Sequence, residues 1–204
     1  MNFHNLKKSQ ILQDVFVLNF FEKKSGFFLD LGCGDGISYP CGNNTFLLEC
    51  FGWDGLSVDF DQSLINAFSK NRKTKAVCKD LTKYSIGEIL QENSCPKVID
   101  YLSFDVDEAT PHALRSLPLT NYKFKFITFE HNLYLNQEKY KNLKQEAFNL
   151  LKDEYEILIE NVNLINHGPV EDWYVHKELT KDKKKIYLKD FFCQDILHKY
   201  EIWN

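Results

Sequence analysis

The stretch Leu29-Asp30-Leu31-Gly32-Cys33-Gly34-Asp35-Gly36 decides the fold, and it directly follows the apolar pair Phe27-Phe28. An apolar run that ends in closely spaced glycines is typical of a buried strand followed by a tight turn, because glycine lets the backbone turn sharply and approach a ligand. A dinucleotide fingerprint would need a third glycine or alanine where Ile37 or Ser38 stands. The stretch therefore favours a different ligand-binding turn; a purely structural strand–helix turn is the alternative.

Short apolar runs alternate with amphipathic stretches along the whole chain, as is typical of βαβ units. We expect strands over residues 27–31, 56–60, 75–78, 99–106, 124–129, 155–165 and 172–177. We expect helices over residues 7–22, 45–51, 61–70, 85–91, 111–117 and 136–152, and a short helix in the tail from Asp190 onward. The late pair of strands flanks Gly168-Pro169 and predicts an antiparallel end to a mostly parallel sheet.

Length and composition indicate one soluble α/β domain. The chain has 204 residues, of which 44% are hydrophobic and 26% charged, with a net charge of −4. We expect a single domain over 1–204, with an N-terminal helix in 1–25, a core in 26–178 and a tail in 179–204. The acidic balance disfavours nucleic acid as the main partner. No membrane helix or signal peptide fits the pattern, and the six cysteines lack zinc-site spacing, so a cytoplasmic location with reduced thiols is expected.

The glycine-rich turn is very similar to the DxGxGxG motif of class I methyltransferases that use S-adenosylmethionine. In that group the turn wraps the methionine end of the cofactor, an acid after the second strand faces the ribose, and an acid or amide after the third strand lies near the adenine. Asp59 and Asp80 stand at those places, although each alone could be a helix cap. The resemblance implies a Rossmann-like, seven-stranded, mostly parallel sheet with an antiparallel last strand and helices on both faces. It also implies cofactor-binding roles for Asp30, Gly32, Cys33, Gly34, Asp59, Phe60, Asp80, Leu81 and Asp105.

The order of several short motifs resembles the FkbM family of methyltransferases, whose members mostly methylate hydroxyls of sugars, polyketides and other small molecules. The resemblance covers roughly residues 9–177. Its motifs are Ser9-Gln10, Gln13 to Leu18, Asn43-Asn44-Thr45, Phe51-Gly52-Trp53, Ile99 to Asp107, Ile127 to Asn132 and Glu171 to Val175. One departure stands out: the family usually has Asp-Val-Glu-Gly after the fourth strand, and here Val106 precedes Asp107-Glu108-Ala109, so the glycine is absent.

Acidic residues and a histidine follow the fourth and fifth strands, where ligands bind in open α/β sheets. A hydroxyl must lose its proton as it attacks, which calls for a general base or a divalent metal. The candidate catalytic residues are His131, Asp105 and Asp107. The resemblance to magnesium-dependent catechol-type O-methyltransferases implies a site for Mg²⁺ or another divalent cation at Asp105, Glu130 and Asn132. The alternative is that Asp107 and Glu108 cap the next helix and His131 is a structural loop histidine.

The resulting hypothesis is an S-adenosylmethionine-dependent O-methyltransferase for a small-molecule hydroxyl acceptor, with a saccharide or glycosylated metabolite favoured. We expect the Asn44-Thr45 loop, the segment after Asp107 and residues 131–134 to form the pocket rim, and Tyr39 and Cys41 to line the cofactor pocket or only pack nearby. This rim has few cations, which favours a neutral acceptor; the charged segment 181–185 is read as a solvated turn or an anion site.

Two rival functions stay open. A nucleic-acid methyltransferase of the amino-directed type carries an Asn/Asp-Pro-Pro-aromatic motif, which Asp105-Val106-Asp107-Glu108 lacks. A non-catalytic protein that retains the cofactor fold would differ from an enzyme only in turnover.

Overall fold

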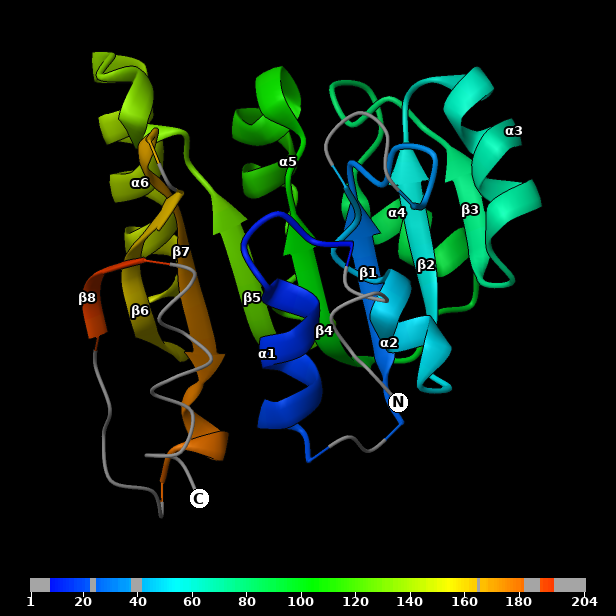
Figure 1. Ribbon diagram of the computed structural model, residues 1–204, viewed down its shortest axis with the longest axis horizontal. Helices are drawn as coiled ribbons and strands as arrows, with labels where there is room; N and C mark the ends of the chain where they lie inside the picture. The colour runs from blue at the N-terminus through cyan, green and yellow to red at the C-terminus, as the bar shows by residue number, and fades with distance from the viewer. Residues whose placement is uncertain (1–7, 23–24, 38–41, 165, 182–187, 193–204) are drawn as a thin grey trace. The chain divides into compact units, whose positions relative to one another are not determined.

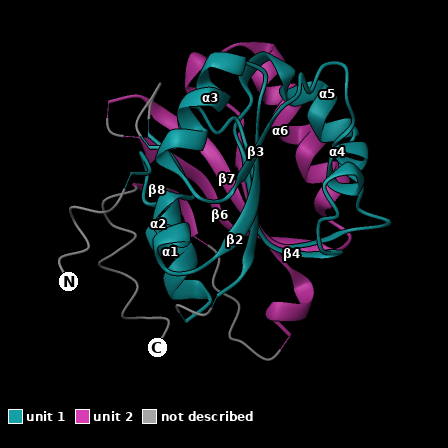
Figure 2. Ribbon diagram, turned by 90° about the vertical axis from the view of Figure 1, so that its right-hand side faces the viewer, with its two compact units in different colours: residues 1–124 teal, residues 125–204 magenta. Residues whose placement is uncertain are grey.

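The computed structural model describes residues 8–22, 25–37, 42–164, 166–181 and 188–192. The chain forms two compact units, residues 1–124 and residues 125–204, which are coloured separately in Figure 2. No helix among these described residues is long and apolar enough to cross a membrane.

Unit 1 alternates helices and strands, as the sequence predicts (Figure 1). Its elements are α1 (Gln13–Phe20), β1 (Phe27–Leu31), α2 (Phe46–Cys50), β2 (Asp54–Asp59), α3 (Gln62–Asn71), β3 (Lys75–Cys78), α4 (Ile86–Glu92), β4 (Val98–Phe104), the 3₁₀ turn η2 (Asp107–Ala109) and α5 (Thr110–Arg115). The strands follow the order β3-β2-β1-β4 and are all parallel. Helices α1, α2 and α3 cover one face of these strands, and α4 and α5 cover the other (Figure 2).

The strands of unit 1 read as continuous apolar runs because both faces of a parallel sheet are covered by helices. Phe28 and Leu29 in β1 and Val58 in β2 are fully buried. Helix α3 begins where the sequence predicts a helix, and Asp61 caps it: its side chain accepts a hydrogen bond from the backbone N–H of Ser63. Helix α4 begins with a capping box between Ser85 and Glu88. Local sequence signals therefore set where these helices start.

Unit 2 contains most of β5 (Lys123–Glu130) and ends in antiparallel pairing. Its further elements are η3 (Leu133–Leu135), α6 (Glu138–Leu151), β6 (Tyr155–Leu164), β7 (Gly168–His176), η4 (Lys177–Leu179) and β8 (Leu188–Phe192). The strand order is β5-β7-β6-β8, with β7 antiparallel to both β5 and β6. The rings of Phe126 and Trp173 meet edge to face at 6.0 Å in its core. The prediction of a mostly parallel α/β fold with an antiparallel end is confirmed.

Three details of the prediction are wrong. The structure has eight strands, not seven, because β8 pairs in parallel with β6, so residues 190–192 extend a strand where a helix was expected. Helix α1 begins at Gln13 instead of residue 7, after Leu12 in a left-handed conformation with φ 66°. In α6, helical spacing predicts a buried face of Tyr140, Leu143, Ala147 and Leu150. Leu150 is instead 41% exposed and Leu151 is buried, because the buried face repeats every four residues through Leu143 and Ala147.

Candidate active site

The carboxyl ends of the four strands of unit 1 meet at one edge. In the register of the sheet, Leu31 lies beside Val58 on one side and Phe104 on the other, and Asp59 lies beside Cys78. The predicted cofactor residues of unit 1 follow these strand ends directly. The parallel topology therefore brings together segments that are far apart in the sequence, at the edge where ligands bind in open α/β sheets.

The glycine-rich turn is shaped by close backbone approach. Gly32 has φ +85°, and a Cβ added there would lie 1.6 Å from the carbonyl oxygen of Asp105. Gly36 has φ +81°, and a Cβ added there would lie 2.6 Å from the ring of Phe68. The backbone N–H of Gly32 donates to the carbonyl oxygen of Val58 at 2.9 Å. Any side chain at these two positions would displace the neighbouring strand or helix, so glycine is a steric requirement here.

Asp59 is bonded to the turn itself. Its Oδ2 accepts a hydrogen bond from the backbone N–H of Gly34 at 3.0 Å, and its Oδ1 accepts one from the N–H of Asp61 at 3.0 Å. The residue is 9% exposed. Each carboxylate oxygen has two lone pairs, so both oxygens retain capacity to accept further hydrogen bonds. The next residue, Phe60, is 76% exposed, which is unusual for a phenylalanine.

Asp80 follows β3 and is engaged locally. Its Oδ1 accepts hydrogen bonds from the N–H and hydroxyl of Thr82 at 2.9 and 2.6 Å, and its Oδ2 pairs with Lys83 at 2.8 Å. The bond from Lys83, followed by those from Thr82, holds the pKa of Asp80 well below its usual range. Leu81 is buried at 4% exposure. The predicted contacts of both residues with a cofactor stay predictions.

The side chains of Asp30 and Cys33 point into the protein. Asp30 is 2% exposed, and its Oδ2 accepts hydrogen bonds from Thr45 at 2.8 Å and Asn43 at 3.0 Å. Burial raises the pKa of Asp30 against the lowering effect of these bonds. The Cys33 thiol packs with Ile65 and Phe68 of α3. Only the backbone groups of these two residues, and not their side chains, are therefore available to a ligand.

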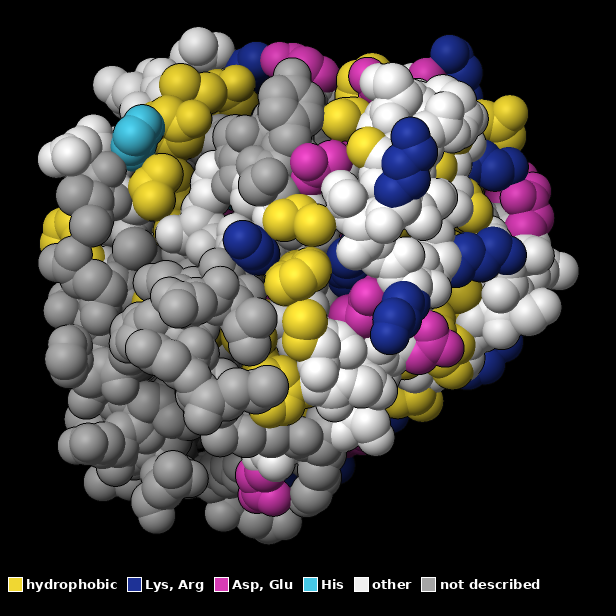
Figure 3. All heavy atoms as spheres, turned by 45° about the vertical axis from the view of Figure 1, so that its right-hand side comes forward, with side chains coloured by type: hydrophobic (Ala, Val, Ile, Leu, Met, Phe, Trp, Pro, Cys, Tyr) yellow, Lys and Arg dark blue, Asp and Glu magenta, His cyan; other side chains and the backbone are white. Residues whose placement is uncertain are grey.

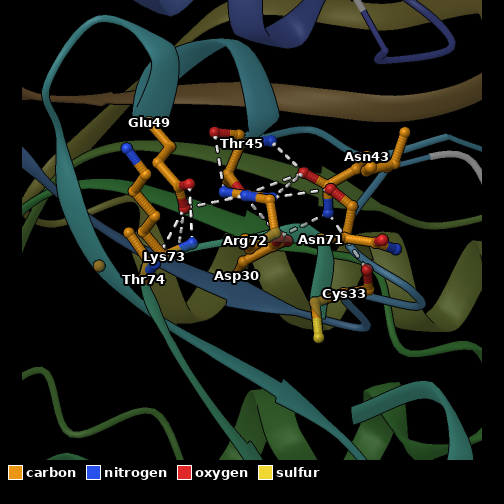
Figure 4. Close-up of polar contacts among 12 residues, drawn as sticks. Asp30, Cys33, Asn43, Thr45, Glu49, Asn71, Arg72, Lys73 and Thr74 are labelled. Atoms are coloured by element: carbon orange, nitrogen blue, oxygen red, sulfur yellow. Dashed lines mark hydrogen bonds and ion pairs between the residues drawn. The ribbon is translucent and has the colours of Figure 1, made fainter. Parts of the chain in front are cut away.

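Sequence reasoning missed a buried polar network under the turn, shown in Figure 4. It is centred on Arg72, which bonds to Gly36, Asn43, Thr45 and Glu49. Thr45 was expected on the pocket rim, and this is wrong: it is fully buried because its hydroxyl donates to Asp30. Only the rarity of arginine in this chain could have drawn attention to Arg72.

Asp105 and Asp107 follow β4. One carboxylate oxygen of Asp105 lies within 4.8 Å of one of Asp107. Asp107 takes a left-handed conformation with φ 45°, in the segment where the FkbM-like pattern has a glycine one residue later. The reading of Asp107 and Glu108 as side-chain caps is wrong, because Ala109 precedes α5 and no side-chain cap bond forms there.

In unit 2, His131 follows β5 and is completely buried. Its Nδ1 accepts a hydrogen bond from the backbone N–H of Leu133 at 3.2 Å, and its Nε2 lies 3.4 Å from Oδ1 of Asp172. That oxygen is also 3.1 Å from the Lys144 ammonium. Burial raises the pKa of Asp172, but His131 and Lys144 outweigh this effect and leave it lowered. The backbone bond from Leu133 thus orients the His131 ring, and its Nε2 lies near the Asp172 carboxylate, which Lys144 also contacts.

The remaining predicted residues have these places. Glu130 ends β5, and Asn132 follows His131 in a left-handed conformation with φ 53°. Tyr39, Cys41 and most of the charged segment 181–185 lie outside the described residues. The metal site at Asp105, Glu130 and Asn132 stays a prediction.

No model of a known protein family matches the chain, and no curated protein matches it. Solved structures of similar fold exist. A TehB-like SAM-dependent methyltransferase from Corynebacterium glutamicum aligns with a TM-score of 0.51 and 14% identity over 79% of this chain and 87% of its own. A putative rRNA methylase from Clostridium thermocellum aligns with a TM-score of 0.53 and 13% identity over 84% of this chain and 98% of its own.

A putative DNA modification methyltransferase from an E. coli prophage aligns with a TM-score of 0.52 and 20% identity over 76% of this chain and 48% of its own, so this chain spans about half its length. Identities this low establish the fold and leave the reaction open. The chain has the Rossmann-like fold of class I S-adenosylmethionine-dependent methyltransferases.

Proposed function

We propose that this chain binds S-adenosylmethionine at the carboxyl edge of unit 1 and transfers its methyl group to a hydroxyl of a small molecule. The carrying observation is the glycine-rich turn, with Gly32 against the Asp105 carbonyl and Gly34 bonded to Asp59. A turn that is already ordered by its own neighbours loses little entropy when a ligand binds. The fold is consistent with this cofactor.

The residues at this edge suit the parts of the cofactor. The backbone of Gly32, Cys33 and Gly34 faces the methionine end, since their side chains are absent or turned inward. The free lone pairs of Asp59 accept the two ribose hydroxyls, which both donate. Phe60 offers an exposed aromatic face to the adenine. When bound, S-adenosylmethionine supplies an electrophilic methyl group.

The chain must align the acceptor and take its proton. The acceptor oxygen forms a bond to the methyl carbon as the carbon–sulfur bond breaks, and the hydroxyl proton goes to a base. Asp105 and Asp107 are our candidates for that base, and Asp105 is also our candidate for a ligand of a divalent cation. Carboxylate and amide oxygens are the donors that Mg²⁺ prefers. His131, with both ring nitrogens next to protein groups, orients its segment in this proposal.

The FkbM-like order of motifs supports a saccharide or glycosylated metabolite as the acceptor, in the cytoplasm. The best-favoured alternative is a nucleic-acid substrate, since two proteins of similar fold are described as acting on rRNA or DNA. Against it, lysines and acids are interspersed on the described part of the face shown in Figure 3, so that part carries no continuous basic stripe.

A transfer assay with isotope-labelled methyl donor tests the proposal. The acceptor panel holds neutral saccharides, nucleotide sugars, RNA and DNA, the last two at low and high salt. We expect label on a neutral or nucleotide sugar, and loss of label with Asp59→Ala. Label on RNA or DNA that falls with salt would establish the alternative, because phosphate contacts weaken with salt. Cofactor binding without turnover on any acceptor would indicate a binding protein.

A further inference from the structure

Arg72 ends α3 and places a charge inside unit 1. Its side chain is fully buried. The guanidinium carbon lies 4.9 Å from the ring centroid of Phe68, 5.6 Å from Phe46 and 5.9 Å from Phe28. Burying a charge costs free energy unless the charge is paired and fully hydrogen-bonded. The partners of the Arg72 guanidinium therefore indicate its role.

All five N–H donors of this guanidinium are used. Nε donates to Oε2 of Glu49 at 2.9 Å. One terminal nitrogen donates to the carbonyl oxygen of Gly36 and to Oδ1 of Asn43, both at 2.9 Å. The other donates to the carbonyl oxygen and hydroxyl of Thr45 at 3.2 and 3.3 Å. A lysine has three donors on one atom and cannot reproduce this planar set.

These bonds hold both ends of the glycine-rich turn. Arg72 bonds directly to Gly36 at its far end. Asn43, which accepts from Arg72, donates through Nδ2 to the carbonyl oxygen of Cys33 at 3.1 Å and to Asp30 at 3.0 Å (Figure 4). One buried side chain thereby links the start of the turn, its end and the beginning of α2.

We propose that Arg72 is a positioning residue for the cofactor: it holds the glycine-rich turn in its binding conformation without touching the ligand. This inference rests on the proposed function. The completely buried side chain has no surface to offer a ligand, so any effect on binding must pass through the groups that it bonds, namely Gly36, Asn43 and Thr45 on the side of the turn. Arg72 thus stabilises the backbone of the glycine-rich turn from inside the protein. It differs in this from surface arginines, which bind phosphate groups directly.

The test compares Arg72→Lys and Arg72→Met with the control Glu49→Gln. The control removes a charge from the same network but touches no turn residue. Calorimetry gives the Kd for S-adenosylhomocysteine, urea denaturation gives stability, and hydrogen exchange gives amide protection at residues 32–37. Lysine keeps the charge, and methionine avoids a buried charge altogether, so at least one variant should fold.

We expect both Arg72 variants to raise the Kd for S-adenosylhomocysteine by about tenfold or more. Both should also lose amide protection at residues 32–37, while the amides of β4 stay protected. Glu49→Gln should lose stability with a Kd within about twofold of the wild type. Equal Kd values in Arg72→Lys and wild type, with unchanged hydrogen exchange at residues 32–37, would overturn the inference about Arg72 and leave the proposed function standing.

A wild-type protein that binds no S-adenosylhomocysteine would overturn the inference and the proposed function together, and hydrogen exchange would still report whether Arg72 orders the turn. Asn43→Ala keeps Arg72 but removes the branch that runs through Asn43, namely its bonds to Cys33 and Asp30 and those that it accepts from Arg72 and Thr45. It must weaken binding even if neither Arg72 variant folds; an unchanged Kd in that variant would also overturn the inference.

Discussion

Oδ2 of Asp59 lies 3.0 Å from the backbone nitrogen of Gly34 and accepts its hydrogen bond. The acid that ends β2 therefore shapes the turn that follows β1. A carboxylate that both orders the turn and faces the proposed ribose site couples the two halves of the cofactor site.

Replacing Asp59 by alanine should weaken the binding of S-adenosylhomocysteine. The change removes the acceptor for Gly34 and the proposed acceptor for the ribose, and bonds to a charged group are worth about 1.5–3 kcal/mol, roughly 10- to 150-fold in Kd. Asp100→Ala is the matched control. Its Oδ2 also accepts a backbone N–H, that of Phe27 at 2.9 Å, but at the other end of the strands. Calorimetry should show a raised Kd for the first variant only; equal values would contradict the site.

Replacing Gly32 by alanine should be far more damaging than replacing Gly52. Both glycines have positive φ, +85° and +83°. A Cβ at Gly52 meets nothing within 4 Å, so Gly52→Ala carries only the conformational cost of about 1–2 kcal/mol. A Cβ at Gly32 meets the Asp105 carbonyl and must displace β4. Urea denaturation measures both; similar losses of unfolding free energy would mean that the turn does not approach β4 as described.

The contribution of Glu49 to stability should depend on pH. Burial raises its pKa, but bonds from Thr74 and Lys73 and the charge of Arg72 outweigh this, so the net pKa lies below its usual 4.5. Because the folded-state pKa is the lower one, the stabilisation is complete above the unfolded-state value and is lost as pH falls through the folded-state value.

The difference in unfolding free energy between wild type and Glu49→Gln should therefore be largest near neutral pH and shrink in acid. Urea denaturation across the acidic range measures it. Glu138→Gln, at an exposed pair with Lys141, should change little at any pH. A wild-type advantage over Glu49→Gln that stays constant down to strongly acidic pH would show that the carboxylate charge is not what stabilises the network.

Removal of divalent cations should stop turnover and leave cofactor binding intact. A carboxylate ligand such as Asp105 would release Mg²⁺ to a chelator, and added Mg²⁺ should restore activity. Asp105→Asn should raise the Mg²⁺ concentration needed for half-maximal activity more than it raises the Kd of the cofactor. Full activity in excess chelator would reject the metal and leave a side-chain base, with Asp105 and Asp107 then tested by substitution.

The elements that local patterns govern were predictable. The strand and turn at residues 27–36 and the start of the helix near Asp61 follow from the sequence alone, because each is specified by residues that are neighbours along the chain. Strand β8 was not, since residues 188–192 pair with β6 about thirty positions away and lack an alternating apolar pattern.

The Arg72 network could not be predicted from the sequence either, because its members are also far apart along the chain. Its partners Gly36, Asn43 and Thr45 lie between 27 and 36 positions away, and no periodicity relates them. A sequence motif is enough to propose the residues that would bind the cofactor. The residues that position this motif can be identified only from the three-dimensional structure.

Isothermal titration calorimetry of the wild-type chain with S-adenosylmethionine, S-adenosylhomocysteine and NAD⁺ tests the central claim most directly. We predict saturable binding of both sulfur compounds at one site per chain, and no binding of NAD⁺, since the turn lacks the dinucleotide fingerprint. Binding of NAD⁺ together with no binding of either sulfur compound at millimolar concentration would contradict the account.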